Sequence, residues 1–113
     1  MKNYISEQVA RVCSELRKTL PAPEERKINP ARPTQLTPRL ISDVVWLCLL
    51  NMVEVEVARW HMTNSVVSRR SISRNVDYIA KLADRLHKFG VISYRTSAKT
   101  TLDAVRASIS HDT

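Results

Sequence analysis

A cluster of basic and polar side chains between positions 69 and 75 has the composition of a phosphate-binding surface. Arg69, Arg70 and Arg74 are interleaved with serines and with Asn75. Arginine holds phosphate oxygens with two parallel hydrogen bonds, and hydroxyl and backbone N–H groups at a helix N-terminus are natural phosphate ligands. Arginine and asparagine also pair with the edges of guanine and adenine. This chemistry predicts contact with a nucleic acid.

The residues after this cluster predict the helix that presents it. Apolar residues recur from Val76 to Leu86 at the i, i+3, i+4 and i+7 intervals of a helix with one buried face. The only glycine, Gly90, follows at a place where helices commonly end in the left-handed conformation. The run Val91–Tyr94 has the branched and aromatic character of a strand. We therefore expect a helix at about 74–89, with its N-terminal end exposed, and then a strand.

This pattern resembles the winged-helix DNA-binding family over about Val66–Val105. The shared features are a helix that ends in Leu86-x-x-x-Gly90-Val-Ile and a following strand with a basic residue. The resemblance implies a mainly α (α+β) fold, a small helical domain with a C-terminal β-hairpin wing. It makes 74–89 the recognition helix and Thr96–Lys99 the wing tip. The DNA-binding residues that it implies are Arg69, Arg70, Ser73, Arg74, Asn75, Tyr78, Lys81, Arg85, Arg95 and Lys99.

Two segments next to this helix have open alternatives. In the winged-helix interpretation Val66–Ser73 is a short helix or a strand with a turn, and Thr100–Val105 returns as the second wing strand. In the rival interpretation Thr101 caps a last helix over Leu102–Ile109, because apolar residues in that stretch also fall at helical intervals.

The N-terminal part predicts a helix and then a proline-rich segment. Apolar residues from Ile5 to Leu20 recur at intervals of four, three, four and four, which predicts a helix over Asn3–Leu20 that packs on the core or on a second copy. All five prolines fall in Pro21–Pro38, which favours an extended linker or arm. The expected organisation is thus a helix at 1–20, a linker at 21–38 and a winged-helix-like domain at 39–113.

The segment Pro38–His61 is the most apolar part of the chain. Thr37 and Pro38 form a good helix start, a hydroxyl N-cap followed by proline at the first position. Apolar residues then occupy nearly every side of the helix, which is typical of a helix surrounded by others or shared between subunits. Val53–Val57 alternates with the period of a strand, but the flanking residues favour helix.

Charge points to polyanionic partners, and no motif points to catalysis. The formal net charge is +7 and the isoelectric point is about 9.9. Residues 65–113 carry nine basic and four acidic side chains, a net of +5. Asp77 and Asp84 each lie four residues before a lysine, as in ordinary surface ion pairs. The three histidines lie far apart and outside known metal or nucleophile motifs, so we expect no enzyme, no cofactor and no metal.

These features lead to one main expectation for function and one alternative. The main expectation is a small cytoplasmic regulator that binds double-stranded DNA and forms a homodimer through its apolar helices. Cys13 and Cys48 are expected to stay reduced, and no segment has the length of a secretory signal or membrane span. The alternative is a helical protein–protein interaction module, such as an adaptor, assembly subunit or inhibitor, without a nucleic-acid role. RNA binding is less favoured, since aromatic residues make up only 5% of the chain.

Overall fold

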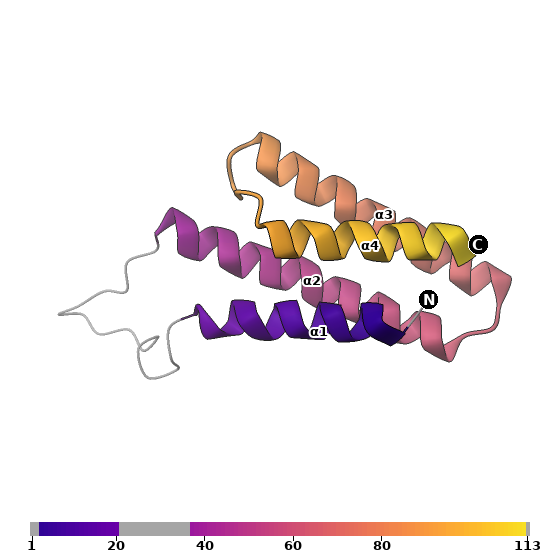
Figure 1. The fold of residues 1–113 in the computed structure, drawn as a ribbon. Coiled ribbons are helices and arrows are strands. Elements are labelled where there is room, and N and C mark those ends of the chain that lie inside the picture. Colours follow the sequence, from indigo (N-terminus) through magenta and orange to yellow (C-terminus); the bar gives the residue numbers. More distant parts are fainter. Residues whose placement is uncertain (1–2, 21–36, 113) are drawn as a thin grey trace, which may run out of the picture.

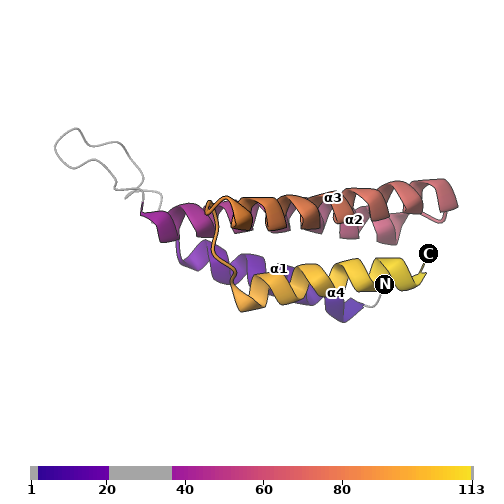
Figure 2. The ribbon, with the colours of Figure 1, turned by 90° about the horizontal axis from the view of Figure 1, so that it is seen from above.

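Four helices make up the fold of the residues that the computed structural model describes, 3–20 and 37–112. They are α1 (Asn3–Lys18), α2 (Pro38–Met62), α3 (Val66–Lys88) and α4 (Thr96–Asp112). The helices alternate in direction, each packs on the next, and α4 packs back on α1 (Figure 1). Seen from above, α2 and α3 form one layer and α1 and α4 the other (Figure 2). The arrangement is an up-down-up-down bundle.

One continuous core fills the space between the layers. The predicted stripe of α1 is buried from Ile5 to Leu16, although the helix ends at Lys18 and Leu20 is only partly buried. α2 contributes its two tryptophans, Trp46 and Trp60, which are both almost completely buried. The residues predicted as a separate N-terminal helix thus share their core with α2 and α4. The linker predicted at 21–38 lies outside the described residues except for Thr37 and Pro38.

Short polar caps define where the two long helices begin. The Thr37 hydroxyl accepts a hydrogen bond from the Leu40 N–H at 3.1 Å, and Pro38 follows it, as predicted. Ser65 caps α3 in the same way and accepts from the Ser68 N–H at 3.4 Å. The alternating segment Val53–Val57 is helical within α2, so the helix interpretation is confirmed there.

The winged-helix resemblance and the β-hairpin wing are wrong. The part of the chain that the structure describes holds no strand, and residues 96–112 form α4. Ala98, Leu102, Val105 and Ile109 are all buried at helical intervals, so this segment gains more by packing as a helix than by pairing as a hairpin. The fold is all-α, not α+β.

The helix predicted at 74–89 is longer than expected at its N-terminal end. α3 begins at Val66, so the short element predicted at Val66–Ser73 is its first two turns. The rival interpretation, a last helix, is confirmed as a helix but not in its bounds. α4 begins at Thr96, and Thr101 is buried within the helix instead of capping its start. Phe89, the apolar residue that follows the predicted buried face, is the C-cap and is 76% exposed.

Gly90 ends α3 in a Schellman motif. Its φ is +77°, the Gly90 N–H donates to the His87 carbonyl at 3.0 Å, and the Val91 N–H donates to the Leu86 carbonyl at 2.9 Å. The left-handed glycine predicted after this helix is therefore confirmed. It reverses the chain so that Val91–Arg95 leads back toward α4.

Replacing Gly90 tests this reversal. A Cβ at Gly90 meets no atom within 4 Å, so only the left-handed conformation opposes a side chain. We expect Gly90→Ala to lower the free energy of unfolding by about 1 kcal/mol, and Gly90→Asn to cost less, because asparagine tolerates this conformation. Urea denaturation measures both. Equal losses for alanine and asparagine would contradict this explanation.

Candidate nucleic-acid interface

The outer face of α3 carries a row of basic side chains. Arg70, Arg74, Lys81, Arg85 and Lys88, here called the cationic row, recur at helical intervals and are all exposed. The row extends over 18 residues, or about 27 Å at 1.5 Å per residue. Within the described part of the chain, no carboxylate pairs with Arg70, Arg74, Arg85 or Lys88. Only Lys81 is paired, with Asp77 at 2.9 Å.

The acidic residues of α3 lie on the side of the helix that faces α4. Asp77 pairs with Arg106 of α4 as well as with Lys81. Asp84 accepts hydrogen bonds from the Tyr94 hydroxyl at 2.6 Å and from Lys99 at 3.4 Å. These contacts separate the charges of α3 by face. The carboxylates take part in packing against α4, whereas the outer face is positive along its length.

Five of the predicted DNA-binding residues belong to or border this row. Arg70, Arg74, Lys81 and Arg85 lie in it, and Tyr78, 62% exposed, lies beside it toward α2. Lys88 completes the row and was not among the predicted residues. Lys88 lies three residues after Arg85, and this helical interval could have predicted that the two side chains share a face. Because α3 begins at Val66, Arg74 lies in the third turn and not at a helix tip.

Three other predicted residues on α3 are engaged with neighbouring helices. Arg69 stacks on Trp60 with its guanidinium carbon 4.7 Å from the ring centroid. Asn75 donates a hydrogen bond to Glu56 of α2 at 3.2 Å. Ser73 is half-buried on the side of α3 toward α4, beside Ile109. These contacts hold the bundle together, so these side chains do not extend the exposed row.

Arg95 and Lys99, predicted on the wing, lie on the connection to α4 and on its first turn. Arg95 pairs with Asp43 of α2, its Nε 3.4 Å from Oδ1. Lys99 pairs with Asp84 at 3.4 Å and with Asp103 at 3.1 Å. Each is largely covered and neutralised by carboxylates. The structure therefore does not bring these two residues together with the cationic row.

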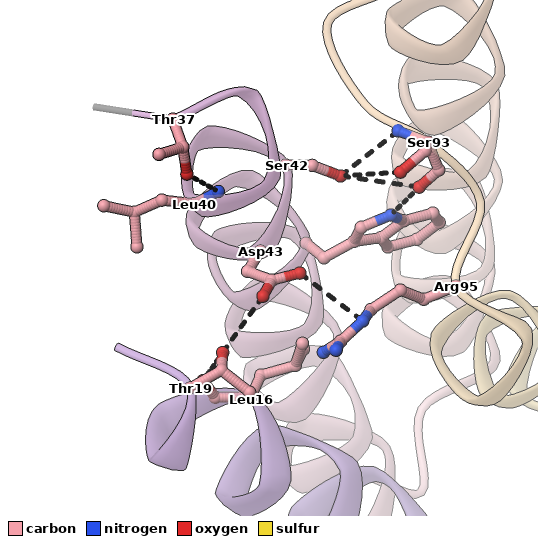
Figure 3. Close-up of polar contacts among 9 residues, drawn as sticks. Leu16, Thr19, Thr37, Leu40, Ser42, Asp43, Ser93 and Arg95 are labelled. Atoms are coloured by element: carbon pink, nitrogen blue, oxygen red, sulfur yellow. Dashed lines mark hydrogen bonds and ion pairs between the residues drawn. The ribbon is translucent and has the colours of Figure 1, made fainter. Parts of the chain in front are cut away.

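A polar clamp fixes the connection between α3 and α4 to α2 (Figure 3). The Ser93 N–H donates to the Ser42 hydroxyl at 3.1 Å, and the Trp46 indole N–H donates to the Ser93 carbonyl at 2.8 Å. Asp43 is buried and lies 3.1 Å from the Thr19 hydroxyl in addition to its contact with Arg95. A shallow cavity between Arg39, Asp43 and Ser93 opens beside these residues. Every buried polar group of the clamp has a partner, which is the pattern of a structural contact.

A second exposed surface runs along α2. Its residues Ile41, Val44, Cys48, Met52 and Val55, here called the α2 stripe, share the outer side of the helix. The side chains are all exposed, the four larger ones by between 39% and 58%. The stripe residues follow one another at helical intervals of three and four in the sequence. Because α2 is apolar on nearly every side, these intervals alone did not predict which side would remain exposed.

Comparisons with known proteins add no relationship to this description. No protein-family model, curated protein or solved structure matches the chain. Within residues 3–20 and 37–112, no three histidine, cysteine or acidic side chains come together in a way that would hold a metal ion. The four helices described above are each too short or too polar to cross a membrane.

Removing one hydroxyl tests the clamp. Ser42→Ala deprives the Ser93 N–H of its acceptor, and we expect it to lower the free energy of unfolding by about 1 kcal/mol. Ser93→Ala keeps the backbone contacts and is the control, with an expected change within about 0.5 kcal/mol. Urea denaturation measures both variants. A cost for Ser93→Ala as large as that for Ser42→Ala would show that the hydroxyl–backbone contact is not the stabilising one.

The contact between Tyr94 and Asp84 predicts a pH dependence. The hydrogen bond from Tyr94 is the main cause that lowers the pKa of Asp84, and Lys99 adds to it. A lowered folded-state pKa means that ionised Asp84 adds stability above its ordinary pKa near 4, and that this stability is lost as the pH falls. Tyr94→Phe keeps the ring that stacks on His87 at 3.8 Å.

We therefore expect Tyr94→Phe to raise the pKa of Asp84 toward its ordinary value. The stability difference between wild type and variant should be present at pH 7 and shrink toward pH 3. Carboxyl NMR titration and urea denaturation at both pH values measure the two effects. A stability difference that is the same at pH 7 and pH 3 would contradict the assignment.

Proposed function

We propose that the protein binds double-stranded DNA by laying the outer face of α3 along the phosphate backbone. The observation that carries this proposal is the separation of charge on α3. Asp77 and Asp84 are paired toward α4, while the cationic row faces away from the bundle. Cations that carboxylates already neutralise contribute little to binding a polyanion. Four cations of the row, Arg70, Arg74, Arg85 and Lys88, have no carboxylate partner among the described residues, and only Lys81 is paired, with Asp77.

The dimensions of the row fit a polyanion that is regular and long. About 27 Å of helix corresponds to about eight base pairs of duplex at 3.4 Å each. The middle of this length is held against the core, because the inner face of α3 is buried from Ile72 to Ala83. The contacts expected are mainly from arginine to phosphate, which position a protein on DNA without specifying sequence. Tyr78, beside the row, is the aromatic residue nearest to such a contact.

Such binding depends on salt in a predictable way. Each phosphate neutralised contributes about 0.9 to the slope of log affinity against log salt, so five cations give a slope of at most about −4.5. Arg70→Ala, Arg74→Ala and Arg85→Ala combined should reduce this slope by about 2.7 and weaken binding to mixed-sequence duplex DNA. Mobility-shift titrations at several salt concentrations measure the slope.

The matched control removes the same charge from the other layer. Arg11, Arg17 and Lys18 are exposed on α1, and their combined replacement by alanine also lowers the net charge by three. Circular dichroism checks that both triple variants remain folded. If the α1 variant lost as much affinity and slope as the α3 variant, binding would follow net charge and not the row. If wild type did not shift DNA at low salt, the proposal would be wrong.

A second candidate function is a helical protein–protein interaction module without a nucleic-acid role. The α2 stripe favours it, because exposed apolar residues on one side of a long helix are typical of a surface that another protein covers. Absence of a DNA shift together with self-association or capture of a defined partner would support this candidate instead.

A further inference from the structure

The residue spacing of the α2 stripe is symmetric about its central residue. Its residues, Ile41, Val44, Cys48, Met52 and Val55, follow at intervals of three, four, four and three, so that Cys48 lies at the centre. This spacing suits an antiparallel pair of identical helices, because each stripe residue then lies opposite another stripe residue of the second copy. We propose that the α2 stripe is the contact surface of an antiparallel homodimer whose twofold axis passes beside Cys48.

In this register each contact pairs side chains of suitable size. Ile41 meets Val55 of the second copy, Val44 meets Met52, and Cys48 meets its own equivalent. The small central cysteine lets the helices approach closely, and the larger residues fill the space on either side. The groove that Met52 and Val55 form with Tyr78 of α3 widens the surface at one end.

Charge favours a second copy on the α2 stripe over an acidic partner. The chain carries a net charge of +7, so two copies repel each other over most of their surfaces. None of the five stripe residues is charged, because Asp43 is buried and Glu54 lies toward Cys13 of α1. Two copies therefore approach there with the least repulsion. An acidic partner would be attracted instead to the cationic row on α3.

Charge also favours the antiparallel direction. Arg59 is the first charged residue beyond the stripe on the same side of α2. Arg59 is paired with Glu56 of the same helix at 3.0 Å. A parallel pair would still place the two Arg59 guanidinium groups opposite each other, and like charges that face each other disfavour an interface. An antiparallel pair centred on Cys48 separates them by about 33 Å, since they are 22 residues apart along the paired helices.

The size of the stripe predicts a reversible dimer. A strip five residues long on one helix, with its flanks, buries roughly 1,000 Å² in total, which is near the lower limit for a specific interface. We therefore expect a dissociation constant in the micromolar range, and a monomer–dimer equilibrium that sedimentation can follow.

Cys48 makes the axis directly testable. Two helices packed 8–10 Å apart, with Cα atoms about 2.3 Å from each axis, bring facing Cα atoms to about 3.4–5.4 Å. That range overlaps the Cα separations of about 4.4–6.8 Å found in disulfides. Cys13 does not compete, because it is buried and burial, together with Glu54, raises its pKa to about 12.

The experiment uses the full chain and diamide, an oxidant that takes up the two hydrogens as two thiols join. Wild type should form a covalent dimer, and Cys48→Ser should not. Two further variants, Cys48→Ser/Val44→Cys and Cys48→Ser/Met52→Cys, should fail to cross-link alone but cross-link when mixed, because these positions face each other only in the antiparallel register.

Other outcomes overturn the proposal. Cross-linking of either double variant by itself would indicate a parallel or shifted pair. A wild-type chain that stays monomeric by sedimentation at about 100 µM, well above the expected micromolar constant, would show that a different protein or solvent covers the stripe.

Val44→Asp should abolish the dimer at unchanged helicity, whereas the alanine variants of the cationic row should leave it intact. Failure of DNA binding and failure of dimerisation are therefore distinguishable.

Discussion

The apolar character of α2 is the constraint on which the rest of the structure depends. A helix with apolar residues on nearly every side cannot remain at the edge of a small protein, and here α1, α3 and α4 all contact it. Trp46, Leu50, Val53 and Trp60 are almost completely buried by these neighbours. Burial of a large side chain stabilises the fold by about 1.5–3 kcal/mol, so α2 supplies much of the driving force for assembly. Three neighbours nevertheless leave one side uncovered, and that side is the α2 stripe.

The position of α3 follows from α2 and divides the charges of the chain. α3 buries Ile72, Val76, Ile79 and Ala83 against the core, which turns its acidic side toward α4 and its basic residues outward. The separation arises because Arg106 and Lys99 on α4 provide partners for Asp77 and Asp84. The α2 stripe and the cationic row thus belong to two helices that lie side by side in one layer (Figure 2).

Local patterns predicted α1, α2 and the end of α3, but they did not fix the start of α3 or decide between a β-hairpin and α4. The start of α2, the buried stripe of α1 and the glycine that ends α3 depend on residues close together in sequence, and all three were predictable. Val91–Tyr94 has strand-like residues, but its backbone is bound by Ser42 and Trp46, about 50 positions away. The same limit applies to the candidate site. Arg74, Lys81 and Arg85 lie at helical intervals in the predicted helix, but Arg70 joins their face because α3 begins earlier, at Val66. The partners of Asn75 and Arg95, and Asp84 as a partner of Lys99, come from other helices.

The polar clamp has a consequence for how other chains can associate with this one. An extended segment such as Val91–Arg95 normally exposes unused N–H and carbonyl groups, to which a foreign peptide adds as a new strand. At Ser93 both groups are already occupied by side chains of α2. This extended stretch is thereby closed to strand addition at its centre. The segment is protected there from edge-to-edge aggregation.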